Sequence, residues 1–115
     1  MKNRIILVLA LFVLGISYGQ EVKPKFEKQG DLLKATYFYD NESVKQVGFF
    51  NQNKLHGEWI SYDEKGNKTT IAHYENGIKT GVWLVLDNGK VKQVTYDSNK
   101  IIDVKILKET DLALH

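Results

Sequence analysis

Residues 57–63 read GEWISYD and residues 81–87 read GVWLVLD, so a glycine, a tryptophan and an aspartate recur 24 positions apart. A second motif also recurs. VGFFN at 47–51 precedes the first copy, IAHYE at 71–75 matches it and precedes the second copy, and VTYD at 94–97 matches both and follows the second copy. Self-similarity at a fixed period is the sequence signature of a repeat protein. Each unit of 22–24 residues holds an aromatic-rich strand, a turn, a β-branched strand and a second turn.

Turn residues separate the expected strands. Asn76-Gly77 and Asn88-Gly89 favour two-residue hairpins, because asparagine and glycine adopt positive φ angles at low cost. Short strands joined by such turns predict an all-β fold, a single-layer twisted antiparallel meander of about seven strands. The strands are expected at 34–40, 44–50, 57–62, 68–74, 81–86, 90–96 and 101–107.

Both faces of this sheet carry apolar side chains, because successive residues of a strand point to opposite faces. The pattern therefore favours an open sheet, partly exposed on both faces, over a closed barrel. Aromatic residues at equivalent repeat positions are expected to form cross-strand ladders, Trp59 with Trp83, and Phe50 with Tyr74 and Tyr96.

An open sheet leaves two ends that need covering. Residues 20–36 are expected to form an N-terminal cap segment, 37–107 the repeat sheet and 108–115 a frayed tail. A capping helix over 103–114 is the alternative for the C-terminal end.

The first residues read as an export signal. Lys2 and Arg4 precede an apolar run at 5–16, and small residues stand before a cut after Gly19, which predicts a signal peptide at 1–19. The apolar run is too short to cross a membrane. We therefore expect a periplasmic or extracellular protein with no transmembrane span after cleavage. Its charge is balanced, because Lys plus Arg falls from 16 to 14 against 14 Asp plus Glu.

The repeat resembles the MORN-repeat variant over about 37–100, through Gly-x-Trp, an aspartate, a turn and a β-branched strand that ends in an aromatic residue. The resemblance implies a small secreted member of the bacterial antitoxin-like MORN-repeat proteins. The tyrosine that MORN repeats usually carry two positions before the glycine is absent, because Leu55 and Lys79 stand there. The resemblance is therefore to the variant repeat and not to the type tied to phospholipid binding.

The chain offers little for catalysis or metal binding. It has no cysteine, and His56 and His73 are the only histidines inside the expected sheet, the first read as a loop residue and the second as a strand residue. A zinc site needs three or four ligands. Some similar short chains are described as nicotinate-mononucleotide adenylyltransferases, but the His-x-Gly-His motif of that class is absent. We expect no catalytic residue, metal or cofactor, and no enzyme.

The exposed aromatic residues are the candidates for binding, because tyrosine and tryptophan are enriched at interfaces. Balanced charge argues against nucleic acid as a partner. The sequence therefore predicts an exported repeat module that binds a protein or an envelope surface, with a structural envelope role without a dedicated ligand as the alternative. The expected interaction face consists of Trp59, Trp83, Tyr62, Phe50, Tyr74 and Tyr96.

Overall fold

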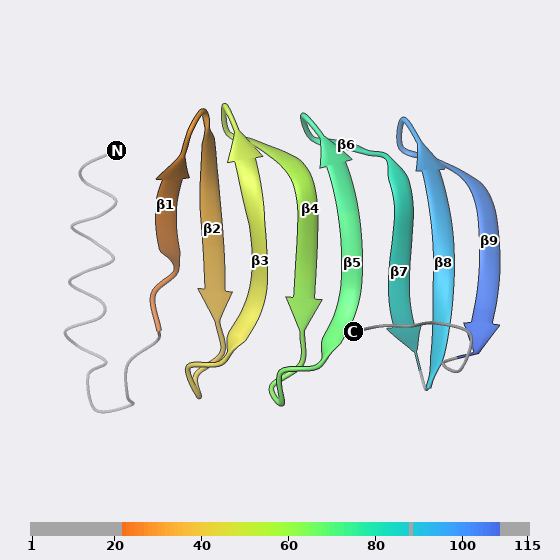
Figure 1. The fold of residues 1–115 in the computed structure, drawn as a ribbon, viewed down its shortest axis with the longest axis horizontal. Helices are drawn as coiled ribbons and strands as arrows, with labels where there is room; N and C mark the ends of the chain where they lie inside the picture. The colour runs from red at the N-terminus through yellow and green to blue at the C-terminus, as the bar shows by residue number, and fades with distance from the viewer. Residues whose placement is uncertain (1–21, 88, 109–115) are drawn as a thin grey trace, which may run out of the picture.

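A computed structural model describes residues 22–87 and 89–108. They form one open antiparallel sheet of nine strands, in which the strands follow one another in chain order (Figure 1). β6 is a two-residue strand that pairs only with β5, ahead of β7. The strands are β1 (Lys25–Gln29), β2 (Leu32–Phe38), β3 (Val44–Asn51), β4 (Lys54–Tyr62), β5 (Lys68–Glu75), β6 (Ile78–Lys79), β7 (Gly81–Asp87), β8 (Lys90–Asp97) and β9 (Lys100–Lys108).

Four two-residue turns lie along one end of the sheet, where β1 joins β2, β3 joins β4, β5 joins β6 and β8 joins β9 (Figure 1), and the last three share one backbone conformation. Both residues of each of these three turns have positive φ, the requirement of the type I′ turn that matches the twist of antiparallel strands. Asparagine or glycine fills most of these positions because they tolerate this backbone conformation best. The pairs are Gln52 and Asn53 (φ 49° and 68°), Asn76 and Gly77 (48° and 86°), and Ser98 and Asn99 (49° and 71°).

The loop between β4 and β5, at the other end of the sheet, is organised by Asp63. Its Oδ1 accepts hydrogen bonds from the backbone N–H groups of Lys65 and Asn67, each at 2.9 Å. Two backbone bonds close the same loop, Asp63 N–H to the Asn67 carbonyl and Gly66 N–H to the Asp63 carbonyl. One exposed carboxylate therefore fixes the turn that joins two central strands.

The sheet has two different faces. The aromatic face carries large rings from seven strands, and the aliphatic face carries a cross-strand row of β-branched and leucine side chains. The rings are Phe26, Tyr37, Phe50, Trp59, Tyr74, Trp83 and Tyr96. The row runs from Val47 to Ile60, Ile71 and Leu84.

Few side chains are fully buried, as one layer allows. The core cluster lies on the aromatic face and consists of Trp59 with Ala35 and Ala72. Val91 and Val94 are buried on the opposite faces of β8. Small residues on β2 and β5 therefore provide the floor on which one large indole packs.

The expected all-β meander is confirmed, and it is longer than the seven strands that the sequence indicated. β1 was not expected as a strand, because KFEKQ has a single apolar residue, Phe26. β6 is the short first part of a strand that the positive φ of Gly81 interrupts. The helix considered over 103–114 is wrong as far as 108, because β9 extends to Lys108. The expected signal peptide at 1–19 and the tail beyond 108 lie outside the described residues.

Candidate functional site

The Gly-x-Trp sequence forms a repeated structural unit. Gly57 and Gly81 both have positive φ, 77° and 72°, which favours glycine. Opposite Gly57 the register between β3 and β4 shifts between Val47 and Phe49. The irregularity bends the strand, as bulges do, and aims the tryptophan two residues later across the aromatic face.

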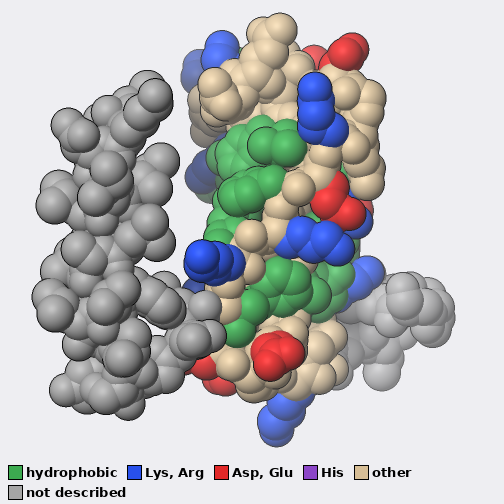
Figure 2. Space-filling model, turned by 90° about the vertical axis from the view of Figure 1, so that its left-hand side faces the viewer, with side chains coloured by type: hydrophobic (Ala, Val, Ile, Leu, Met, Phe, Trp, Pro, Cys, Tyr) green, Lys and Arg blue, Asp and Glu red, His purple; other side chains and the backbone are tan. Residues whose placement is uncertain are grey.

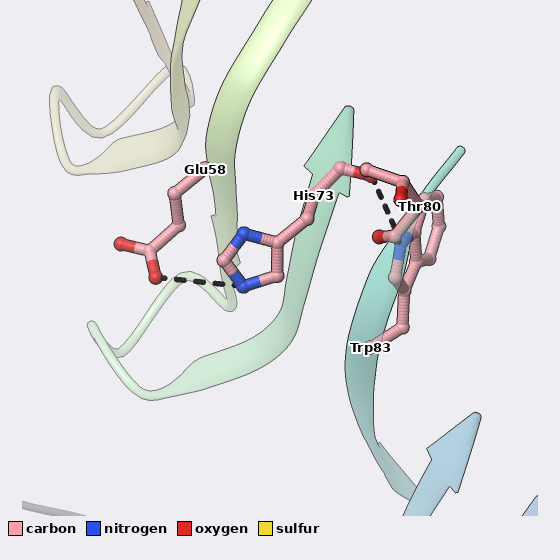
Figure 3. A network of polar contacts seen from close by, with 4 residues as sticks. All are labelled: Glu58, His73, Thr80 and Trp83. Atoms are coloured by element: carbon pink, nitrogen blue, oxygen red, sulfur yellow. Dashed lines mark hydrogen bonds and ion pairs between the residues drawn. The ribbon is translucent and has the colours of Figure 1, made fainter. Parts of the chain in front are cut away.

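The indole nitrogen of each tryptophan donates to a backbone carbonyl ten residues earlier. Trp59 Nε1 donates to the Phe49 carbonyl at 2.9 Å, and Trp83 Nε1 donates to the His73 carbonyl at 3.1 Å. Trp83 Nε1 also lies 3.2 Å from the Thr80 carbonyl, and Figure 3 shows both acceptors beside its ring. The 24-residue recurrence of the sequence is therefore a recurrence of the same hydrogen bond.

The two tryptophans differ in burial, and the residue beneath each ring explains the difference. A Cβ atom at Gly48 would overlap the indole of Trp59, so only glycine lets that ring lie directly on β3. Trp59 is 4% exposed. Ala72 occupies the position 24 residues after Gly48, and its methyl group prevents the same approach by Trp83. Trp83 is half-buried and offers more of its ring to solvent.

The rings alternate between tryptophan and tyrosine or phenylalanine, whereas the sequence predicted ladders of equivalent residues. Among the described residues, Phe50 meets Trp59 edge-on with ring centroids 5.2 Å apart. The ring of Trp83 lies between those of Tyr74 and Tyr96, with ring centroids 5.2 Å and 4.8 Å away. The reason is register, because the pairing shifts at each glycine, between β3 and β4 at Gly57 and between β5 and its partners β6 and β7 at Gly81, and this places the tryptophan beside an aromatic residue of the preceding strand.

Lys79 adds a positive charge to the second half of this face. Its Nζ atom lies 5.3 Å from the ring centroids of both Trp83 and Tyr96, within the range of a cation–π interaction. Lys79 was not among the expected site residues. Its signal was present in the sequence, because it replaces Leu55 at the repeat offset of 24 and so substitutes a cation for an aliphatic side chain.

Tyr74, Trp83, Tyr96 and Lys79 are all half-buried, and together we call them the aromatic patch. Burial raises the pKa of the Tyr74 hydroxyl above its ordinary value, and the neighbouring Tyr96 raises it further. The patch therefore presents three aromatic rings beside the Lys79 side chain, with the Tyr74 hydroxyl protonated at neutral pH. Such a surface supplies contact area and a single basic side chain.

The six residues of the expected interaction face separate into three groups. Tyr74, Trp83 and Tyr96 share the aromatic patch, and Phe50 lies on the same face beside the buried Trp59. Tyr62 lies on the aliphatic face, where it borders an open hollow of about 470 Å³. That hollow is lined by Lys34, Thr36, Val44, Val47, Tyr62 and Gly66.

The two histidines have local structural partners. His56 belongs to β4 and not to a loop, and its Nδ1 accepts a hydrogen bond from the backbone N–H of Asn76 at 3.2 Å. His73 Nε2 lies 3.9 Å from a carboxylate oxygen of Glu58 on the adjacent strand (Figure 3). Within residues 22–87 and 89–108, no three histidine or acidic side chains gather as a metal site would require.

No protein-family model, curated protein or solved structure matches this chain. In the part of the chain that the structure describes, no helix is long and apolar enough to span a membrane. The surface chemistry of the sheet is therefore the feature of the chain that bears on its function.

Proposed function

We propose that the chain is an exported, non-enzymatic repeat module that binds a protein or an envelope surface through the aromatic patch. The observation that carries the proposal is the half-buried state of Trp83 between two tyrosines, while its repeat equivalent Trp59 is sealed into the core. If the rings served the sheet alone, both tryptophans could be buried in the same way. The second repeat instead keeps ring surface available.

The chemistry of the patch favours a protein partner. Tyrosine and tryptophan offer large, stiff, amphipathic surfaces that lose little rotamer entropy on binding. Lys79 contributes one cation, which suits an acidic or carbonyl-rich counterpart beside the rings. The resemblance to MORN-variant repeats and the predicted signal peptide support an interaction module of the envelope.

The test compares two matched surface variants of the exported product, recovered after expression of the full-length chain. Tyr96→Thr removes a ring from the patch, and threonine keeps β-propensity. Val82→Thr changes an exposed residue of the aliphatic face next to Trp83 and serves as the control. Both variants are first checked for an unchanged circular dichroism spectrum.

We expect the unchanged chain and Val82→Thr to retain the same envelope proteins, and Tyr96→Thr to lose them. Retained proteins are identified by mass spectrometry and their affinity is measured with purified material. If all three baits retain the same set, the patch does not bind and a structural role without a ligand is favoured. Turnover in a nicotinate-mononucleotide adenylyltransferase assay by the pure protein would overturn the non-enzymatic part of the proposal.

A further inference from the structure

The outer edge of β9 is open. β9 is nine residues long, and among the described residues its only strand partner is β8. An unpaired strand edge presents a row of backbone N–H and C=O groups that can template pairing with another strand. Its large apolar side chains are among the most exposed in the described chain: Ile101 57%, Ile102 62%, Val104 50% and Ile106 58%.

The register separates the apolar and charged residues of the central part of β9, residues 103–106, by face. Val104 pairs with Val94 and Ile106 with Lys92, so their side chains lie on the aromatic face. Asp103 and Lys105 alternate with them and lie on the aliphatic face, with their charged groups 3.9 Å apart. The central part of β9 therefore has apolar side chains on one face and one charge of each sign on the other.

We propose that β9 pairs antiparallel with β9 of a second copy of this chain, about a two-fold axis through Val104. This register places Asp103 opposite Lys105 of the second copy, and Lys105 opposite its Asp103. On the other face it places Ile102 opposite Ile106 of the second copy. The pair is centred on residues 103–105, because the irregularity in the pairing of β9 with β8 falls at Ile102. The aromatic faces of the two copies form one continuous surface.

Charge at the centre of the pair favours this register over its neighbours, although the same register also places Lys100 opposite Lys108 of the second copy at the two ends of the strands. A two-fold axis normal to an antiparallel sheet keeps each face on its own side, so pairing about a two-fold axis can shift its centre only by whole residues. Centring the pair on Asp103 would place two carboxylates opposite each other, and centring it on Lys105 would place two ammonium groups opposite each other. Like charges directly opposite destabilise a strand pair, whereas opposite charges stabilise it.

The other edge of the sheet is less suited to pairing. β1 is five residues long and follows Pro24, which has no backbone N–H to donate. The Nζ atom of Lys25 and the Oε2 atom of Glu27, both on β1, lie 3.7 Å apart. Figure 2 looks onto this edge and shows lysine and acidic side chains among the hydrophobic ones. Short, charged edge strands that follow proline are a common protection against edge-to-edge association.

The experiment measures dimerisation of the exported product by sedimentation equilibrium over a concentration series. Asp103→Lys is expected to raise the dimer dissociation constant about tenfold or more, because two lysine–lysine contacts replace two opposite-charge pairs. Lys105→Asp is expected to do the same. The double exchange Asp103→Lys with Lys105→Asp restores opposite charges in the proposed register and is expected to recover the original constant.

Glu27→Lys is the matched control, because it makes the same reversal on the β1 edge and should leave the constant unchanged. The intrachain pair of Asp103 and Lys105 is exposed and contributes little to folding, so each variant should keep its circular dichroism spectrum. A monomer at every concentration would overturn the proposal. The proposal would also be overturned if Asp103→Lys left the dimer dissociation constant unchanged, or if Glu27→Lys raised it. A double exchange whose dissociation constant does not return to the original value would overturn it as well. The outcome is independent of the aromatic patch, because Tyr96→Thr leaves the outer edge of β9 intact.

Discussion

Trp59 donates its indole hydrogen to the carbonyl oxygen of Phe49, on the strand before its own. The bond holds the ring flat over Gly48 and thereby joins β3 to β4 through a side chain as well as through the backbone. Trp83 makes the equivalent bond to His73 one repeat later. Each tryptophan and its hydrogen bond therefore help to stabilise a sheet that has no second layer in the described chain.

Trp59→Phe should destabilise the protein more than Trp83→Phe does. Both changes remove an indole hydrogen bond, but only the first leaves a gap in the buried cluster of Ala35 and Ala72. We expect a loss of about 2 to 3 kcal/mol for Trp59→Phe and about 1 kcal/mol for Trp83→Phe. Urea unfolding followed by circular dichroism measures both. Equal losses would show that burial does not distinguish the two repeats.

Gly48→Ala should lower the free energy of unfolding by about 1 to 3 kcal/mol, because the added Cβ atom overlaps the Trp59 indole. Gly48 has no positive φ, so the cost is steric and not a backbone effect. A double-mutant cycle supplies the control. In the Trp59→Phe background the same substitution should cost less, since the smaller ring can move aside. An unchanged cost would place the strain elsewhere.

Asp63 should contribute stability that disappears in acid. Its hydrogen bonds from Asn67 and Lys65 hold the pKa of the carboxyl group below its ordinary value of 3.8. The unfolded chain therefore binds the proton more readily, and the contribution is complete above pH 3.8 and lost as the pH falls through the folded pKa. Urea unfolding at a series of acidic pH values measures this loss.

Two substitutions separate the charge of Asp63 from its geometry. Asp63→Asn keeps an acceptor oxygen for the loop and should remove this part of the pH dependence. Asp63→Ala removes the acceptor and should destabilise the β4–β5 loop at neutral pH as well. Glu64→Gln, which removes the neighbouring carboxyl group, is the control and should change neither property. Identical acid profiles for the unchanged chain and Asp63→Asn would contradict the prediction.

Tyr74 should make the fold sensitive to alkali. Burial, with a further effect of Tyr96, raises the pKa of Tyr74 above its ordinary value of 10.0. The folded state therefore holds this proton longer than the unfolded chain does, and stability should fall as the pH rises above 10.0. Tyr74→Phe keeps the ring and should lose less stability over that interval. Tyrosinate absorbance during the titration checks which hydroxyl ionises late.

The meander could be predicted from sequence because periodicity, turn residues and repeats all indicate the same arrangement. Asn76-Gly77 and the GEWISYD recurrence place strands and hairpins without knowledge of the packing. β1 could not be predicted in this way, because it joins the sheet through backbone pairing with β2 and has only Phe26 as an apolar residue. Pairing with a neighbour, and not its own pattern, determines that strand.

The candidate site was only partly predictable for a related reason. Alternation correctly places Trp59 and Trp83 on one face, but it cannot show that Gly48 lets the first ring sink into the core while Ala72 holds the second higher. It also cannot show that Lys79 lies over two rings, since that contact joins a short strand to β7 and β8. Both features depend on how neighbouring strands pack.

The order of the strands has a mechanical consequence. β1 and β9 form opposite edges of the sheet, and the strands between them follow the chain (Figure 1). A force that pulls these two strands apart therefore acts along the interstrand hydrogen bonds, and every strand pair between the two edges carries the same load. Strands would detach one after another at low force, with no single event at which the whole sheet yields. Under tension the protein would lengthen gradually and act as a compliant element.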